Sequence, residues 1–169
     1  MTPARIALAL AAFAVGILTF SHLTGDPPGA MGKLAREFSL PDTTGQAHAS
    51  TEWAGRVRLI NFWATWCPPC RREIPALIAL QQDFGARGLQ VIGIAMDDAE
   101  AVAAFARETG INYPLLVGDQ DVVELAVDLG NHREALPYTV VLDRAGRIVH
   151  VHAGEVTEAG LAPVLERLL

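Results

Sequence analysis

The spacing of apolar and polar residues along the chain predicts a regular succession of strands and helices. Residues 57–63 are β-prone and apolar on both faces, as is typical of a strand in the middle of a sheet. Four further strands are predicted at residues 89–95, 113–117, 138–142 and 147–152. A turn at residues 143–146 joins the last two of these into an antiparallel hairpin.

Helices are predicted between these strands. Apolar residues recur at helical intervals within residues 74–84, and Asp98 and Asp119 stand at positions typical of helix N-caps. A final helix is predicted around residues 161–168, and a short hairpin followed by a helical turn is predicted within residues 38–55. This alternation predicts an α/β domain with a partly parallel sheet.

The N-terminus carries a long apolar run. Residues 6–20 are apolar or small throughout, and extension to residue 23 gives about 27 Å of helix, slightly less than a bilayer core of about 30 Å. Arg5 precedes the run and Asp26 follows it, a charge bias that leaves the N-terminus in the cytoplasm. The run predicts a membrane anchor, with a cleaved signal peptide as the alternative.

Proline and glycine separate this run from the rest of the chain. Residues 25–32 contain two prolines and three glycines and predict a linker. The predicted organisation is therefore a signal anchor or signal peptide at residues 1–24, the linker, and a folded domain at residues 33–169. We expect that domain to face the periplasm, either on a single-pass anchor in the inner (cytoplasmic) membrane or as a cleaved, soluble protein.

Composition narrows the class of protein further. Hydrophobic residues make up 51% and charged residues 19% of the chain, which excludes an intrinsically disordered protein. The net charge is -6 and the sequence has no basic cluster, so nucleic acid is not an expected partner. Two cysteines are too few for a disulfide-rich scaffold or for a four-cysteine zinc or iron-sulfur site.

The two cysteines form the most informative motif of the sequence. Cys67 and Cys70 are spaced C-x-x-C directly after the predicted central strand and at the start of a predicted helix. A helix N-terminus has free backbone N–H groups and a partial positive charge, which stabilise a thiolate. We therefore expect Cys67 to be the nucleophile and Cys70 to resolve the mixed disulfide, with Pro68 and Pro69 tuning the redox potential.

Other interpretations of the cysteine pair are weaker. A disulfide that closes so short a loop would add little stability, and haem attachment would need histidine where Arg71 stands. A metal site would have to recruit His150 or His152 from a distant strand. We expect no metal and no other cofactor, and a copper-binding chaperone stays as an alternative function.

Two longer stretches carry a resemblance to a known family. Residues 61–75 read NFWATWCPPCRREIP and residues 136–148 read LPYTVVLDRAGRI. Together they resemble the TlpA/ResA branch of membrane-anchored, thioredoxin-like thiol:disulfide oxidoreductases. The resemblance implies a thioredoxin-like fold with an N-terminal β-hairpin and a central helix-strand insertion at residues 98–117.

The same resemblance implies a function and its partners. It implies a reductant of protein disulfides outside the cytoplasmic membrane, commonly in cytochrome c maturation or in the reduction of copper-site cysteines. It also implies a membrane electron donor of the thioredoxin-reducing type. An oxidase or isomerase of exported proteins is the alternative within redox chemistry. A peroxidase is more distant, because its Pro-x-x-x-Thr-x-x-Cys motif is absent from the sequence.

The resemblance also implies roles for individual residues. Pro137 matches the family's cis-proline, which offers its backbone to a substrate chain, and Trp66 matches a flat substrate-contact surface. Glu73 matches a glutamate that exchanges a proton with Cys70. Asn61 stands where ordinary thioredoxins have a buried aspartate. We expect Glu73 on the helix surface, where its replacement by glutamine would hardly affect stability, and a simple ion pair with a neighbouring arginine is the alternative to a catalytic role.

Overall fold

The computed structural model describes residues 30–169. The predicted signal segment at residues 1–24 and most of the predicted linker lie outside the described residues, so both stay predictions. Within residues 30–169, no helix combines the length and the apolar character that a membrane crossing requires.

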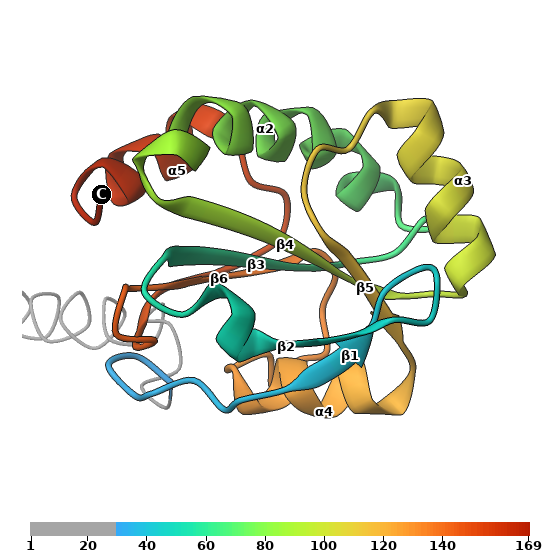
Figure 1. Ribbon diagram of the computed structural model, residues 1–169, viewed down its shortest axis with the longest axis horizontal. Helices are drawn as coiled ribbons and strands as arrows, with labels where there is room; N and C mark the ends of the chain where they lie inside the picture. Colours follow the sequence, from blue (N-terminus) through green and yellow to red (C-terminus); the bar gives the residue numbers. More distant parts are fainter. Residues whose placement is uncertain (1–29) are drawn as a thin grey trace, which may run out of the picture.

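A five-stranded mixed sheet forms the centre of the fold (Figure 1). Its strand order is β5-β4-β3-β6-β7, and β3, β4 and β5 are parallel to one another, whereas β6 and β7 are antiparallel to their neighbours. The strands are β3 (Val57–Trp63), β4 (Leu89–Met96), β5 (Leu115–Gly118), β6 (Tyr138–Leu142) and β7 (Ile148–Ala153). Six of the seven residues of β3 are buried, which confirms the predicted central strand.

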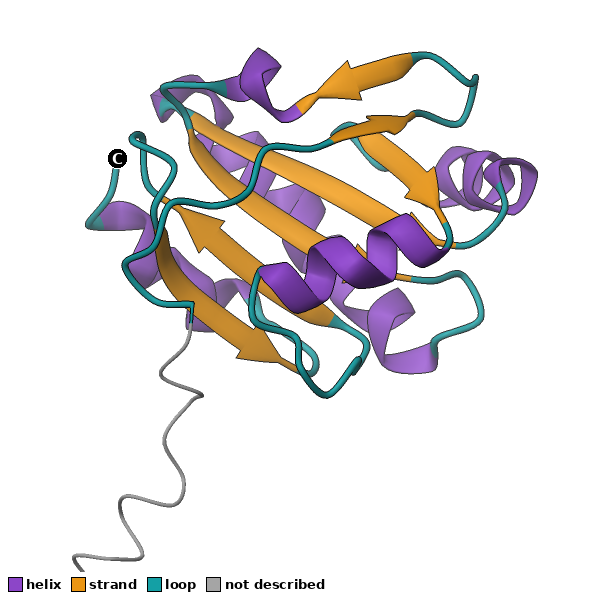
Figure 2. Ribbon diagram, turned by 90° about the horizontal axis from the view of Figure 1, so that it is seen from below, coloured by secondary structure: helices purple, strands orange, loops and turns teal. Residues whose placement is uncertain are grey.

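Helices cover both faces of this sheet. The helices are α2 (Pro68–Phe84), α3 (Ala99–Thr109), α4 (Gln120–Asp128) and α5 (Glu158–Glu166). Helices α2 and α5 lie over one face, and α4 lies over the other together with the hairpin of β1 (Ser39–Pro41) and β2 (Ala47–Ala49) (Figures 1 and 2). Side chains of β3 alternate between the two faces of the sheet. Leu59 packs under α2 and α5, whereas Ile60 and Phe62 pack toward α4.

The predicted elements are present with small shifts at their ends. The hairpin is followed by a short 3-10 helix, η1 (Ser50–Trp53), as expected for the helical turn. Strand β5 begins at Leu115 rather than at residue 113, because Pro114 has no N–H group to donate to a neighbouring strand. Asp119 stands at the N-cap of α4, but its side chain makes no capping hydrogen bond.

Candidate active site

The two cysteines lie at the junction between the central strand β3 and helix α2. Cys67 is the N-cap of α2, and its Sγ accepts a hydrogen bond of 3.3 Å from the backbone N–H of Cys70. The two sulfur atoms form a disulfide with a bond length of 2.05 Å. Cys67 keeps 4% of its surface exposed and Cys70 keeps none, so Cys67 is the more accessible of the two sulfur-bearing residues.

Pro68 and Pro69 occupy the first two positions of α2. Proline at the start of a helix fits the required backbone angle but supplies no N–H group. The N–H of Cys70 is therefore the first backbone donor that α2 offers to the sulfur of Cys67. A thiolate at Cys67 would receive fewer hydrogen bonds here than at a helix N-terminus without prolines.

The peptide bond between Leu136 and Pro137 is cis, as the family resemblance implied. Pro137 directly precedes β6, whose first residue, Tyr138, is paired with Phe62 near the end of β3. This register brings Pro137 to the same end of the sheet as the cysteines. Leu136 packs against the apolar cluster that contains Cys67 and Cys70.

Glu73 lies in the interior, with 1% of its surface exposed. Its Oε1 accepts a hydrogen bond of 2.8 Å from Asn61 Nδ2, and its Oε2 accepts one of 2.8 Å from the backbone N–H of Val156. Burial raises the pKa of Glu73 to about 7 against the opposing effect of these two hydrogen bonds, and the charge of Glu155 raises it further. A carboxyl group with this pKa can both accept and donate a proton near neutral pH.

The expected surface position of Glu73 is therefore wrong. Helix geometry gives the reason, because positions 70, 73 and 77 are spaced three and four residues apart and share the inner face of α2. The alternative of a simple ion pair with a neighbouring arginine is wrong as well. Arg72 pairs instead with Glu155 at 2.7 Å, and Arg71 lies over the ring of Phe105 at 5.3 Å.

Asn61 and Thr139 complete the surroundings of this carboxyl group. Both side chains are fully buried, and Asn61 Nδ2 also donates a hydrogen bond of 3.1 Å to Thr139 Oγ1. The two residues are opposite each other in the pairing of β3 with β6. The sequence singled out Asn61 but not Thr139, whose signal was a small polar residue within the buried strand β6.

Comparison with known proteins agrees with this geometry. The AhpC/TSA family model matches residues 31–151. The thiol-disulfide oxidoreductase ResA of Geobacillus thermodenitrificans (strain NG80-2) is 30% identical over 140 residues, which cover 82% of this chain and 78% of that protein.

The chain belongs to the ResA-like thiol-disulfide oxidoreductases of the AhpC/TSA family.

Solved structures support the same fold. A thiol:disulfide interchange protein of the thioredoxin family from Chlorobium tepidum TLS superposes with a TM-score of 0.71 at 27% identity, over 85% of this chain and 99% of that one. A secreted thiol-disulfide isomerase from Corynebacterium glutamicum gives a TM-score of 0.72 at 25% identity, over 86% and 93% of the two chains. The fold of this oxidoreductase is thus thioredoxin-like, and its redox-active pair is Cys67 and Cys70.

Two tryptophans flank the active-site loop of the oxidoreductase in opposite environments. Trp63 is fully buried in the core and packs against Phe105 with 5.4 Å between ring centroids. Trp66 has 67% of its surface exposed directly beside Cys67. A large exposed aromatic side chain next to a reactive sulfur is available to contact another protein.

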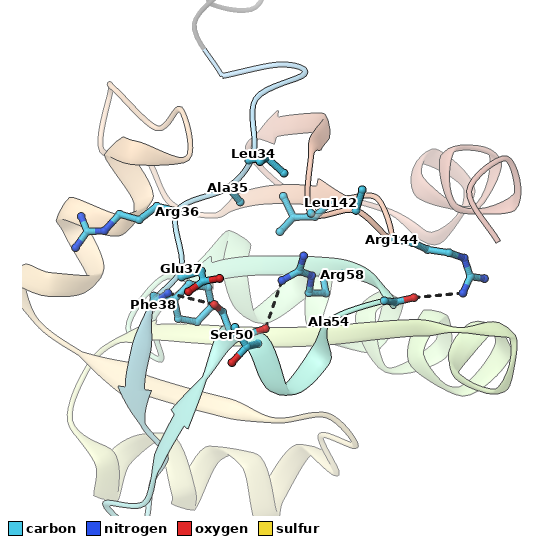
Figure 3. A pocket seen from close by; sticks show the side chains of 14 residues that line it. Leu34, Ala35, Arg36, Glu37, Phe38, Ser50, Ala54, Arg58, Leu142 and Arg144 are labelled. Carbon is cyan, nitrogen blue, oxygen red and sulfur yellow. Dashed lines mark hydrogen bonds between the residues drawn. The ribbon is translucent and has the colours of Figure 1, made fainter.

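A pocket of about 210 Å³ lies away from the cysteines (Figure 3). Its walls include Arg58 from the start of β3, Leu142 from the end of β6, and the segment from Leu34 to Phe38. Because Cys67 follows the opposite end of β3, this pocket is separate from the active site of the oxidoreductase. Within residues 30–169, no group of three or more His, Cys, Asp or Glu side chains is placed to hold a metal ion.

Proposed function

We propose that this oxidoreductase reduces disulfides of protein substrates outside the cytoplasm, tethered to the membrane by residues 1–24. Cys67 is the nucleophile and Cys70 the resolving cysteine. The observation that carries the reducing role is the buried carboxyl group of Glu73, one helical turn after Cys70. Cytochrome c maturation and the reduction of copper-site cysteines are the processes that need such a reductant.

The direction of electron flow follows from how well the reduced form is stabilised. Strong disulfide oxidants owe their high potential to a stabilised reduced form, in which a thiolate receives positive charge and hydrogen bonds. Here Pro68 and Pro69 remove two N–H donors from the start of α2, and Glu73 brings negative charge toward the resolving cysteine. Both features disfavour a thiolate and therefore favour the protein as a reductant.

Glu73 also supplies the proton transfer that the reaction needs. The Cys67 thiolate attacks a substrate disulfide, that S–S bond breaks, and the released substrate sulfur takes up a proton. The Cys70 thiol then passes its proton to the Glu73 carboxylate, and its sulfur attacks Cys67 Sγ. The new Cys67–Cys70 bond releases the second substrate sulfur as a thiolate, which takes up the proton held by Glu73, so that two electrons have passed from the protein to its substrate.

Substrate binding is assigned to Trp66 and Pro137. The exposed ring of Trp66 borders Cys67, and the cis-proline segment lies at the same end of the sheet. A substrate segment that packs on the tryptophan and runs along the proline segment would bring its disulfide to Cys67 Sγ.

Cellular location rests on the N-terminal run of apolar residues. Residues 6–20 carry no charged side chain, and the sites for signal cleavage that follow them are poor. An extracytoplasmic compartment is oxidising, so the dithiol must be restored continually. A membrane electron donor of the thioredoxin-reducing type serves that purpose.

The experiment that tests this function replaces Cys70 with serine in cells. Without the resolving sulfur, the mixed disulfide between Cys67 and a substrate persists, and mass spectrometry identifies the trapped proteins. Trapping of extracytoplasmic proteins with native cysteine pairs supports the proposal, and trapping should be lost in the double variant that also carries Cys67→Ser. A trap that captures only cytoplasmic proteins would contradict the location, and copper bound to the purified protein would favour the chaperone.

A further inference from the structure

The loop that carries Trp66 and Cys67 is held by one carboxylate from a distant part of the chain. The backbone N–H of Thr65 donates a hydrogen bond of 2.9 Å to Asp97 Oδ2, and the Thr65 hydroxyl donates one of 2.6 Å to the same oxygen. Thr65 and Asp97 are both half-buried. Two hydrogen bonds to a carboxylate oxygen fix the residue that directly precedes Trp66.

Asp97 is itself held in place on the opposite side of this contact. Its Oδ1 accepts a hydrogen bond of 2.9 Å from the backbone N–H of Asp98. Asp98 is the N-cap of α3, and its Oδ1 accepts a hydrogen bond of 3.1 Å from Ala101 N–H. The carboxylate of Asp97 therefore joins the active-site loop to the start of a regular helix.

Helix α3 also contacts the active-site region through Phe105. The Phe105 ring packs against Trp63 at the end of β3, and the guanidinium of Arg71 in α2 lies 5.3 Å from its centroid. The segment from Trp63 to Arg71, which includes the active-site loop, thus has contacts to α3 at both of its ends. Asp97 adds a contact at Thr65, next to the exposed ring of Trp66, which borders Cys67.

We propose that Asp97 is a positioning residue, which holds Thr65 so that Trp66 presents its ring to a protein substrate beside Cys67. The proposal rests on the assignment of Trp66 as a substrate contact. It requires that Asp97 matters for disulfides carried on a protein surface and not for small disulfides, because a small disulfide reaches Cys67 Sγ without contacting Trp66.

The test compares single-turnover rate constants of the reduced protein with two probes, insulin and hydroxyethyl disulfide. Asp97→Ala should slow the reaction with insulin about tenfold, the order expected when a charge-assisted hydrogen bond that orients a reacting group is lost. The reaction with hydroxyethyl disulfide should change less than about twofold. The conservative variant Asp97→Asn keeps an oxygen acceptor for Thr65 and should recover most of the insulin rate.

Asp98→Ala is the matched control, because it removes the N-cap of α3 and leaves the hydrogen bonds of Thr65 intact. It should lower the melting temperature. Its rate constants with insulin and with hydroxyethyl disulfide should change by the same factor. Equal losses for both probes in Asp97→Ala would overturn the proposal, since they would mean that the residue acts on thiol chemistry or on folding. Unchanged rates for both would overturn it as well.

A further variant covers the case in which Asp97→Ala does not fold. Thr65→Val removes the 2.6 Å hydrogen bond from the hydroxyl and keeps the backbone N–H donor. It should show the same selective loss with insulin, in smaller degree. Failure of the wild-type protein to react with either probe would contradict the oxidoreductase function itself, and it is thereby distinguished from failure of the role of Asp97.

Discussion

Replacement of Glu73 by glutamine removes a titratable group from the interior at nearly constant shape. In the folded protein the pKa of Glu73 is about 7, against an ordinary value of 4.5, with burial as the main cause. One pKa unit corresponds to about 1.36 kcal/mol, so this shift couples about 3 kcal/mol of stability to pH.

The sign of this coupling follows from which state holds the proton more tightly. Because the pKa is raised in the folded state, the stability from Glu73 is fully present below pH 4.5 and is lost as pH rises through about 7. Glutamine does not ionise and shows no such loss. It does place an NH2 group where a carboxyl oxygen accepts a hydrogen bond from Asn61 or Val156, which costs about 1 to 3 kcal/mol at any pH.

The assay is guanidinium unfolding of the oxidised wild type and of Glu73→Gln between pH 4 and pH 9. We expect the difference in unfolding free energy between them to shift by about 3 kcal/mol in favour of the variant over this range, mostly between pH 4.5 and pH 7. Asp83→Asn, an exposed carboxylate on the same helix, is the control and should show no shift of this size. A pH-independent difference between wild type and Glu73→Gln would refute the account of a buried carboxyl group that titrates near neutral pH.

Three further predictions concern the hairpin, the sheet and the thiols. Hydrogen bonding to Glu52 and then to Asp42 raises the pKa of His48 in the folded state. The stability advantage of wild type over His48→Gln should therefore be largest below pH 6.5 and should decline as pH rises above that value. Unfolding measurements at pH 6 and pH 9 check this. Gly93→Ala should destabilise the protein by about 1 to 3 kcal/mol in denaturant unfolding, because an added Cβ would lie 2.6 Å from Leu115 Cδ2; unchanged stability would contradict the packing. In the reduced protein, alkylation near neutral pH should modify Cys67 well before Cys70, as peptide mass spectrometry would show, and equal labelling rates would contradict the assignment of the nucleophile.

The sequence predicted those parts of the fold that depend on local pattern. Strand β3 was predicted with its observed ends because a β-prone stretch that is apolar on both faces has few other places in a domain. The cis peptide bond before Pro137 came from the family resemblance alone, since local pattern does not distinguish it from a trans bond.

The contacts that the sequence did not reveal join residues far apart in the chain. Glu73 of α2 contacts Asn61 of β3 and Val156 of the loop between β7 and α5, and the nearby Arg71 and Arg72 misleadingly favoured a surface position. Thr65 and Asp97 are likewise brought together only by the pairing of β3 with β4. No spacing rule within one element identifies such partners, although the helical spacing of positions 70, 73 and 77 was a local sign that Glu73 faces inward.

The equilibrium reduction potential of the Cys67–Cys70 pair tests the central claim most directly. Equilibration with glutathione or thioredoxin buffers, read out by alkylation of the free thiols, gives the value. Because prolines at the start of α2 and the carboxyl group of Glu73 both disfavour a thiolate, we expect a potential near that of thioredoxin, about -270 mV. A value near that of a strong oxidant, about -120 mV, would contradict a reducing role and would favour an oxidase of exported proteins.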